Sequence, residues 1–188
     1  MPSRGPACVF RARKSRRPNT VNQNELQQAL TQFAAERLAL LERHEAGARV
    51  VSHYDFNNTY QYVINREEAH VSWVHAALAE LGVPAPKAAS TLSVPPVGKG
   101  GKKVEPSAFR AVLEDDSQQL KAFVDRWRAK VDALGHARHR TMLNVILGES
   151  VEHGRLFEQA ASGFEDLLGR RTGGVARQGA VLPSRWQE

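Results

Sequence analysis

Apolar residues recur at steps of three and four along the chain, and this period constrains the fold most strongly. Between about residues 59 and 81, the residues at these steps are Val63, Glu67, His70, Val74, Ala77 and Leu81. Residues at this spacing lie on one face of an α-helix, and a face this apolar is normally buried against other helices. Three other stretches of the chain repeat the pattern, so an all-α fold is expected.

The four stretches are predicted to be helices over about 22–52, 59–81, 106–134 and 137–168. Asp55, Asn57 and Asn58 mark a short turn between the first two, and Gly135 separates the last two. Residues 83–106 hold five of the nine prolines, so this segment is expected to be a connection without helix. Two helix pairs separated by one long crossover describe a four-helix bundle.

Composition agrees with this reading. The chain has 188 residues and 41% hydrophobic content, enough for one core, and only three Trp, three Tyr and seven Phe. The single cysteine, Cys8, excludes an intramolecular disulfide, a four-cysteine zinc site and a rubredoxin-type iron centre within this chain.

No apolar run approaches the roughly 18 residues of a membrane span, and the N-terminus lacks a secretory signal. A cytoplasmic protein is expected.

The net charge of +6 is confined to the N-terminus. Residues 1–20 contain six basic and no acidic residues, so the remaining chain has 20 basic and 20 acidic residues. We therefore expect three parts: a basic tail over 1–20, the bundle over 21–168 and an irregular C-terminal tail over 169–188. The basic tail is suited to an acidic or nucleic-acid partner or to a role as an Arg-rich targeting segment, although a disordered, solvated extension is the simplest explanation.

Each predicted helix places one carboxylate in its apolar stripe, and the second and fourth helices add a histidine. These residues are Glu36, Glu67, His70, Asp116, Glu149 and His153. An unpaired carboxylate in an apolar interior is strongly disfavoured, so something must compensate for the charge. Four carboxylates balance two divalent cations, and a mixture of carboxylate and imidazole suits iron or manganese. The pattern predicts a dinuclear site that holds two iron ions or an Fe/Mn pair.

With these residues, the chain resembles the ferritin-like superfamily of di-iron carboxylate proteins, which includes bacterioferritins and rubrerythrins, over residues 22–168. The resemblance implies that Glu67 and Glu149 bridge the metals and that the other four residues are terminal ligands. It also implies a reaction of ferrous iron with dioxygen or peroxide, and a homo-oligomer, either a dimer or larger. An external electron donor would be needed for peroxide reduction, since the chain has no rubredoxin-like centre.

Three positions leave alternatives open. Asp116 is shorter than the glutamate usual in that family, and Glu114 lies close by. Glu152 stands where the family's histidine is expected, so Glu149 and Glu152 are an alternative ligand pair. Tyr60 lies seven residues before Glu67, on the same helix face, and is either a tyrosine that supports the metals or a packing residue with a bonded hydroxyl.

Two rival functions remain on the same fold. One is a di-iron monooxygenase that acts on an organic or tRNA substrate. The other is a metal-free bundle that acts as an interaction module. The histidines at 44, 53, 75, 136 and 139 are expected near helix ends or on outer faces, and no chemistry is assigned to them.

Overall fold

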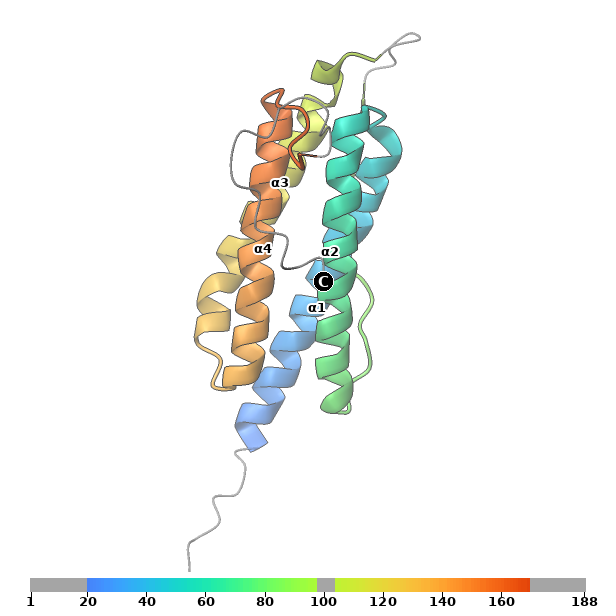
Figure 1. Ribbon diagram of the computed structural model, residues 1–188. Helices are drawn as coiled ribbons and strands as arrows, with labels where there is room; N and C mark the ends of the chain where they lie inside the picture. The colour runs from blue at the N-terminus through green and yellow to red at the C-terminus, as the bar shows by residue number, and fades with distance from the viewer. Residues whose placement is uncertain (1–19, 98–103, 170–188) are drawn as a thin grey trace, which may run out of the picture.

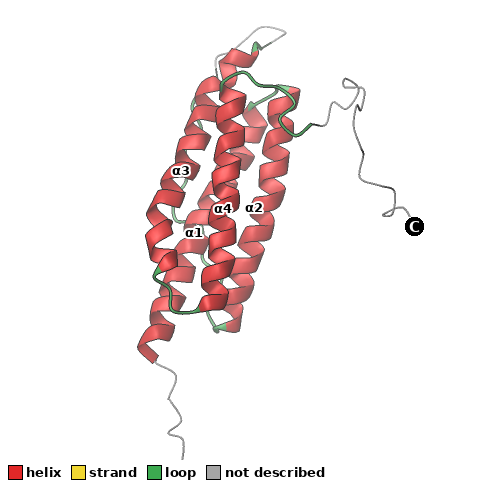
Figure 2. Cartoon of the chain, turned by 60° about the vertical axis from the view of Figure 1, so that its left-hand side comes forward, coloured by secondary structure: helices red, strands yellow, loops and turns green. Residues whose placement is uncertain are grey.

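The protein is an all-α four-helix bundle in the computed structural model, which describes residues 20–97 and 104–169. Within these ranges the elements are α1 Thr20–Val50, α2 Tyr54–Glu80, the 3₁₀ helix η1 Pro106–Phe109, α3 Arg110–Asp132 and α4 Ala137–Ala161. The described residues contain no strand (Figure 2). The predicted fold class and the long crossover between the second and third helices are confirmed. Cys8 and the tails at 1–19 and 170–188 lie outside the described residues.

The crossover determines the direction of the second helix pair. α1 and α2 run antiparallel, the connection then returns along the bundle, and α3 runs in the same direction as α2 (Figure 1). The amide N–H of Ala89 donates to the carbonyl of Ala35 at 2.9 Å, which places the connection along α1. Leu92, Val94 and Val97 pack against the core from this segment. A connection rich in proline therefore still contributes to the hydrophobic interior.

The apolar core runs between the helix pairs and includes aromatic contacts between α1 and α3. The ring of Phe33 meets Phe123 and Trp127 edge-on, with centroid separations of 5.1 and 5.0 Å. All three rings are buried. Edge-to-face pairs of this kind add roughly 0.5–1.5 kcal/mol each to the stabilisation from burial alone.

The turn predicted at Asp55, Asn57 and Asn58 is wrong, because α2 begins five residues earlier than expected. Asp55 lies in the first turn of α2, where a carboxylate complements the helix dipole. The side-chain amide of Asn57 donates to the carbonyls of Ala48 and Val51, at 2.7 and 2.9 Å. Asn57 thus binds the free carbonyls at the end of α1 from within α2, and residues 51–53 alone make the turn.

The fourth helix ends seven residues before its predicted end. Gly163 adopts φ 89° directly after α4. Its N–H donates to the carbonyl of Ala160, and the N–H of Phe164 donates to the carbonyl of Gln159. These two bonds form a Schellman motif, in which a glycine in the left-handed conformation ends a helix. Residues 164–169 then leave the helix axis as an irregular segment.

None of the helices in the described part of the chain combines the length and the apolar character needed to cross a membrane.

Gly47 allows α1 and α2 to approach closely, and its replacement gives a test of the packing. A Cβ at position 47 would lie 2.8 Å from Cε1 of Tyr60, whereas a Cβ at Gly148 would meet nothing within 4 Å. We predict that Gly47→Ala lowers the free energy of unfolding by about 1–3 kcal/mol through overpacking. Gly148→Ala, the matched control, should raise it by about 0.5–1 kcal/mol because alanine favours the helix. Urea unfolding measures both, and an equal gain in the two variants would contradict the packing described here.

Candidate functional site

A network of charged side chains lies in the middle of the bundle, where an apolar interior would be expected. Arg37, Glu67 and Asp116 are 0% exposed, and Arg43 is 1% exposed. Each of the four helices contributes to the network: α1 supplies the arginines, α2 supplies Glu67, α3 supplies Asp116 and α4 supplies Glu149. Buried charges are costly unless they are paired and hydrogen-bonded, so the partner of each group decides what the site can do.

The Glu67 carboxylate is paired through both oxygens with residues of α1. Oε1 lies 3.1 Å from Nη2 of Arg37, and Oε2 lies 2.7 Å from Nδ1 of His44. Burial alone would raise the pKa of Glu67, but the charge of Arg37 and the interaction with His44 outweigh it and lower the pKa to about 2. The carboxylate is therefore ionised at neutral pH, so Nδ1 of His44 carries the proton that is donated to it.

His70 connects Arg37 to Glu149 through its two ring nitrogens. Nη2 of Arg37 donates to Nδ1 of His70 at 3.0 Å, and Nε2 of His70 lies 3.0 Å from Oε2 of Glu149. Because a guanidinium only donates, Nδ1 must accept, and the ring proton stays on Nε2. Burial, together with the charge of Arg37, lowers the pKa of His70 to about 4, so the ring is neutral at pH 7. Arg66 binds Glu149 from the outer side through two N–H groups, at 2.9 and 2.6 Å.

Asp116 is the second fully buried carboxylate. The hydroxyl of Tyr60 donates to its Oδ2 in a short hydrogen bond. Its Oδ1 lies 3.3 Å from Nη2 of Arg43 and 3.6 Å from Nε2 of His44. Burial raises the pKa of Asp116 although His44, Arg43 and the Tyr60 hydroxyl oppose the rise, and burial beside Asp116 also raises the pKa of Tyr60. The hydroxyl of Tyr60 is thus bonded to one of the predicted ligands, a contact that agrees with either of the roles expected for this residue.

His153 is a buried histidine beside the network, and one nitrogen of its ring has no hydrogen bond. The side chain is 1% exposed, and Nδ1 has no hydrogen-bond partner among the described residues. Its ring stacks on that of His70, with the centroids 6.1 Å apart. Burial lowers the pKa of His153 to about 4; Glu67 opposes this fall, while Arg37 and His70 add to it.

Glu36 does not lie in the core stripe where the sequence placed it. Its Oε2 accepts from Arg126 at 3.0 Å and from Nε1 of Trp127 at 3.1 Å, and its side chain is 28% exposed. The residues of α1 that are buried around this position include Phe33, Ala34 and Arg37. Phe33 and Leu40 of the expected stripe are buried, but between them the buried side chain is that of Arg37, so a guanidinium takes the place of the expected carboxylate in the core.

The two alternative ligands also lie at the surface. Glu114 is bonded to Arg110 of its own helix, and Glu152 to Arg155, and the side chains of both acids are about half exposed. Neither contacts the buried network.

Sequence reasoning missed Arg37, Arg43 and His44, all of which lie on α1. His44 was expected near a helix end or on an outer face, and that expectation is wrong: it is 0% exposed and bonded to Glu67. The signal was present, since Phe33, Arg37 and His44 follow the same three- and four-residue steps as the apolar positions. It was overlooked because arginine is usually exposed.

The predicted metal ligands, as arranged, do not fit a dinuclear metal centre. The structure brings Glu67, His70, Glu149 and His153 together, but the donor atoms of the first three face protein N–H groups. His70 uses its one free lone pair to accept from Arg37. Among the described residues, the group of acids and histidines close enough to share a metal ion is His53, Asp55 and Glu165, at one end of the bundle. The ligand roles of the six predicted residues stay predictions.

An open cleft of about 840 Å³ adjoins the network on the face formed by α2 and α4. Glu149 and His153 line the part of the cleft that adjoins the network, and Tyr62, Leu156 and Leu168 supply apolar surface. Arg66 and Arg155 also line it, together with Glu152 and Gln159. The volume falls within the range of roughly 300–1,000 Å³ that is typical of small-molecule sites.

Comparison with known proteins supports the fold and does not extend to function. No protein-family model and no curated protein matches the chain. A crystal structure of a conserved hypothetical protein from Mycobacterium tuberculosis is similar, with a TM-score of 0.57 and 18% sequence identity. The similarity covers 76% of this chain and 98% of that one. At this identity the likeness shows the fold alone.

The neutral buried histidines predict a loss of stability in mild acid. The folded-state pKa of His153 is about 4 and its ordinary value is 6.5, so between these values the unfolded chain binds the extra proton. Lowering the pH from 7.5 to 5 should therefore reduce the free energy of unfolding by about 2 kcal/mol through His153. Urea unfolding at the two pH values measures this loss in the free energy of unfolding. The loss should be smaller in His153→Gln than in the wild type. It should equal that of the wild type in His136→Ala, because the imidazole of His136 is exposed. An equal loss of unfolding free energy in all three proteins would contradict the buried, neutral state of His153.

Proposed function

We propose that this protein is a binding module without metal ions in its core, in which the buried ionic network fixes the helices and the cleft between α2 and α4 takes a small organic anion. The supporting observation is the pairing of the predicted ligand atoms. Arg37, His44 and Arg66 bind the carboxylates or the imidazole lone pair that metal ions would need. This corresponds to the interaction module that the sequence left open, and the proposal adds a binding surface to it.

Charge balance favours a network without metal ions. The two fully buried carboxylates, Glu67 and Asp116, are matched by the two buried guanidinium groups of Arg37 and Arg43. Glu149 is matched by Arg66. Arg43 also donates to Asp115 at 2.9 Å, so four carboxylates face three guanidinium groups. Two divalent ions would add four positive charges to a site with a formal excess of one negative charge. A buried ion pair is tolerated only while both partners are present, because an unpaired buried charge strongly destabilises the fold.

The lining of the cleft indicates the chemistry of its ligand. Tyr62, Leu156 and Leu168 offer an apolar wall for an aromatic or aliphatic body. The guanidinium groups of Arg66 and Arg155 keep N–H donors beyond those bonded to Glu149 and Glu152. A guanidinium recognises a carboxylate or sulfonate through such donors. Because Glu149 and Glu152 are each paired with an arginine, they oppose an incoming anion only weakly.

His153 gives the cleft a polar floor. The imidazole is neutral at pH 7 because of burial, so it can donate from one nitrogen and accept at the other. A ligand with a hydroxyl or carbonyl group near its anionic end would satisfy this ring. We extend the proposal to a cytoplasmic homo-oligomer, as expected from the sequence.

The oxidation of ferrous iron and the monooxygenase reaction remain predictions from the sequence. Either activity requires Arg37 to leave Glu67 and His70, so that the carboxylate and the imidazole can turn to metal ions. The electron donor expected for peroxide reduction belongs to these predictions.

A fluorescent aromatic sulfonate, 1-anilinonaphthalene-8-sulfonate, tests the proposed ligand class, since it joins an apolar body to an anion. We predict that one molecule binds per folded chain and that the affinity is unchanged by EDTA. Arg155→Glu should weaken binding at least tenfold because it reverses the charge of a group lining the cleft. Fluorescence titration gives both the stoichiometry and the affinity.

Arg110→Glu is the matched control, because Arg110 is a similarly exposed arginine paired with a glutamate of its own helix, and its position is remote from the cleft. Its affinity for the probe should equal that of the wild type. Equal weakening in the two variants, or binding that disappears in EDTA, would refute the proposal.

A further inference from the structure

We propose that His53, Asp55 and Glu165 form a binding site for one zinc ion at the end of the bundle where α1 turns into α2. The site is separate from the buried network and from the cleft proposed as a ligand site. It joins the start of α2 to the segment that follows α4.

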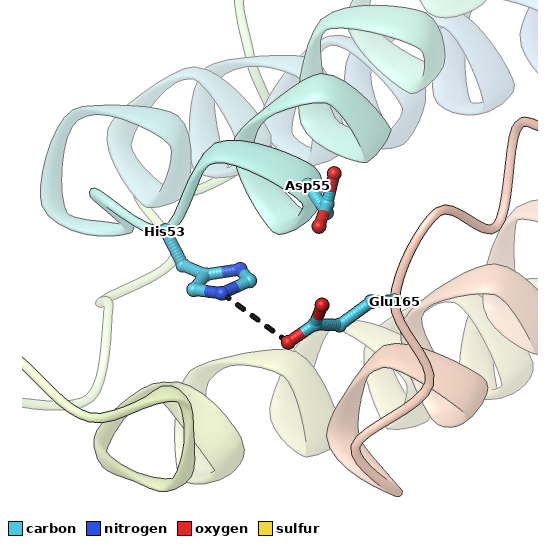
Figure 3. A group of neighbouring side chains, drawn as sticks. All are labelled: His53, Asp55 and Glu165. Atoms are coloured by element: carbon cyan, nitrogen blue, oxygen red, sulfur yellow. Dashed lines mark ion pairs between the residues drawn. The ribbon is translucent and has the colours of Figure 1, made fainter. Parts of the chain in front are cut away.

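The three residues converge from two parts of the chain that are far apart in sequence. His53 directly precedes α2, Asp55 lies in its first turn, and Glu165 lies beyond the end of α4. One ligand atom of each residue lies within 4.8 Å of those of the other two. Figure 3 shows the His53 imidazole and the Glu165 carboxylate turned toward each other with Asp55 beside them, and Nε2 of His53 lies 3.7 Å from Oε1 of Glu165.

Packing and burial partly preorganise the group. The ring of His53 packs on Phe56 at a centroid separation of 4.3 Å, which restricts the orientation of the imidazole. Nδ1 of His53 is buried and has no hydrogen-bond partner among the described residues. Asp55 is 5% exposed, so its carboxylate is held within the fold, whereas the Glu165 side chain is 45% exposed and reaches the site from solvent.

The donor set favours zinc over the hard cations. Imidazole nitrogen suits first-row transition metals, whereas magnesium and calcium prefer oxygen alone. Three protein ligands and a water complete a tetrahedral zinc site with bonds of about 2.0–2.2 Å. Two carboxylates match the charge of one divalent ion. The exposed Glu165 side chain can supply the small movement that brings the three donors into bonding distance.

An ion at this site would fasten the segment that follows α4 to the start of α2. Leu167 of that segment packs against the core. Zinc would thus stabilise the folded chain, because an ion that binds only the folded state shifts the unfolding equilibrium.

Calorimetric titration of the full chain with zinc at pH 7.5, after removal of metals with EDTA, tests the site. We expect one zinc ion per chain and a rise in melting temperature on zinc addition. Glu165→Gln and His53→Ala should each weaken binding at least tenfold and remove the rise in melting temperature. Because Glu165 is exposed, its variant keeps the fold, which circular dichroism can verify.

His136→Ala and Cys8→Ser are the controls, since both remove another possible zinc ligand and should leave the binding unchanged. The proposal is overturned if wild-type protein binds no zinc, or if Glu165→Gln and His53→Ala bind it as tightly as wild type. The proposal is also overturned if Glu67→Gln loses zinc while Glu165→Gln and His53→Ala keep it, because the ion would then be bound in the core.

Discussion

The Arg37 guanidinium lies fully buried between Glu67 and His70, and the polar centre of the bundle depends on these two contacts. Arg37 keeps Glu67 ionised in an apolar interior and requires His70 to carry its proton on Nε2. That proton faces Glu149, whose position also defines the inner edge of the α2–α4 cleft. A buried pair of this kind adds little net stability, but loss of one partner leaves an unpaired charge that costs roughly 3–5 kcal/mol.

The helical period and the proline content of the sequence were sufficient to predict the four helices and the crossover. The same period placed Glu67, His70, Asp116 and His153 in the core, and all four are buried. The burial of Arg37 in place of Glu36 could not be predicted from one sequence. Steps of three and of four from Phe33 reach both positions, and neither side chain carries an apolar signal that would choose between them. The end of α4 depended on the backbone conformation of Gly163, which the period does not reveal.

The correction to α1 changes the meaning of the other residues. With Glu36 inside, the core would hold an excess of negative charge, and metal ions would be the natural compensation. With Arg37 and Arg43 inside, the protein supplies its own cations at fixed positions. Polar residues in a helical core therefore indicate a functional arrangement only after the basic residues on the same faces have been placed. The His53–Asp55–Glu165 group at the bundle's end combines two carboxylates and an imidazole, which is the donor set that we propose for zinc.

The iron content of the protein tests most directly whether arginine, and not metal, compensates the buried carboxylates. Glu165→Gln protein, in which the proposed zinc site is disabled, would be loaded anaerobically with ferrous iron, freed of unbound metal and measured by mass spectrometry, with a second sample that also carries Glu67→Gln. Since Arg37 and His44 already bind Glu67, we predict that neither sample retains a stoichiometric amount of iron. About two irons per chain in the first sample, absent from the second, would contradict the account and establish the dinuclear centre.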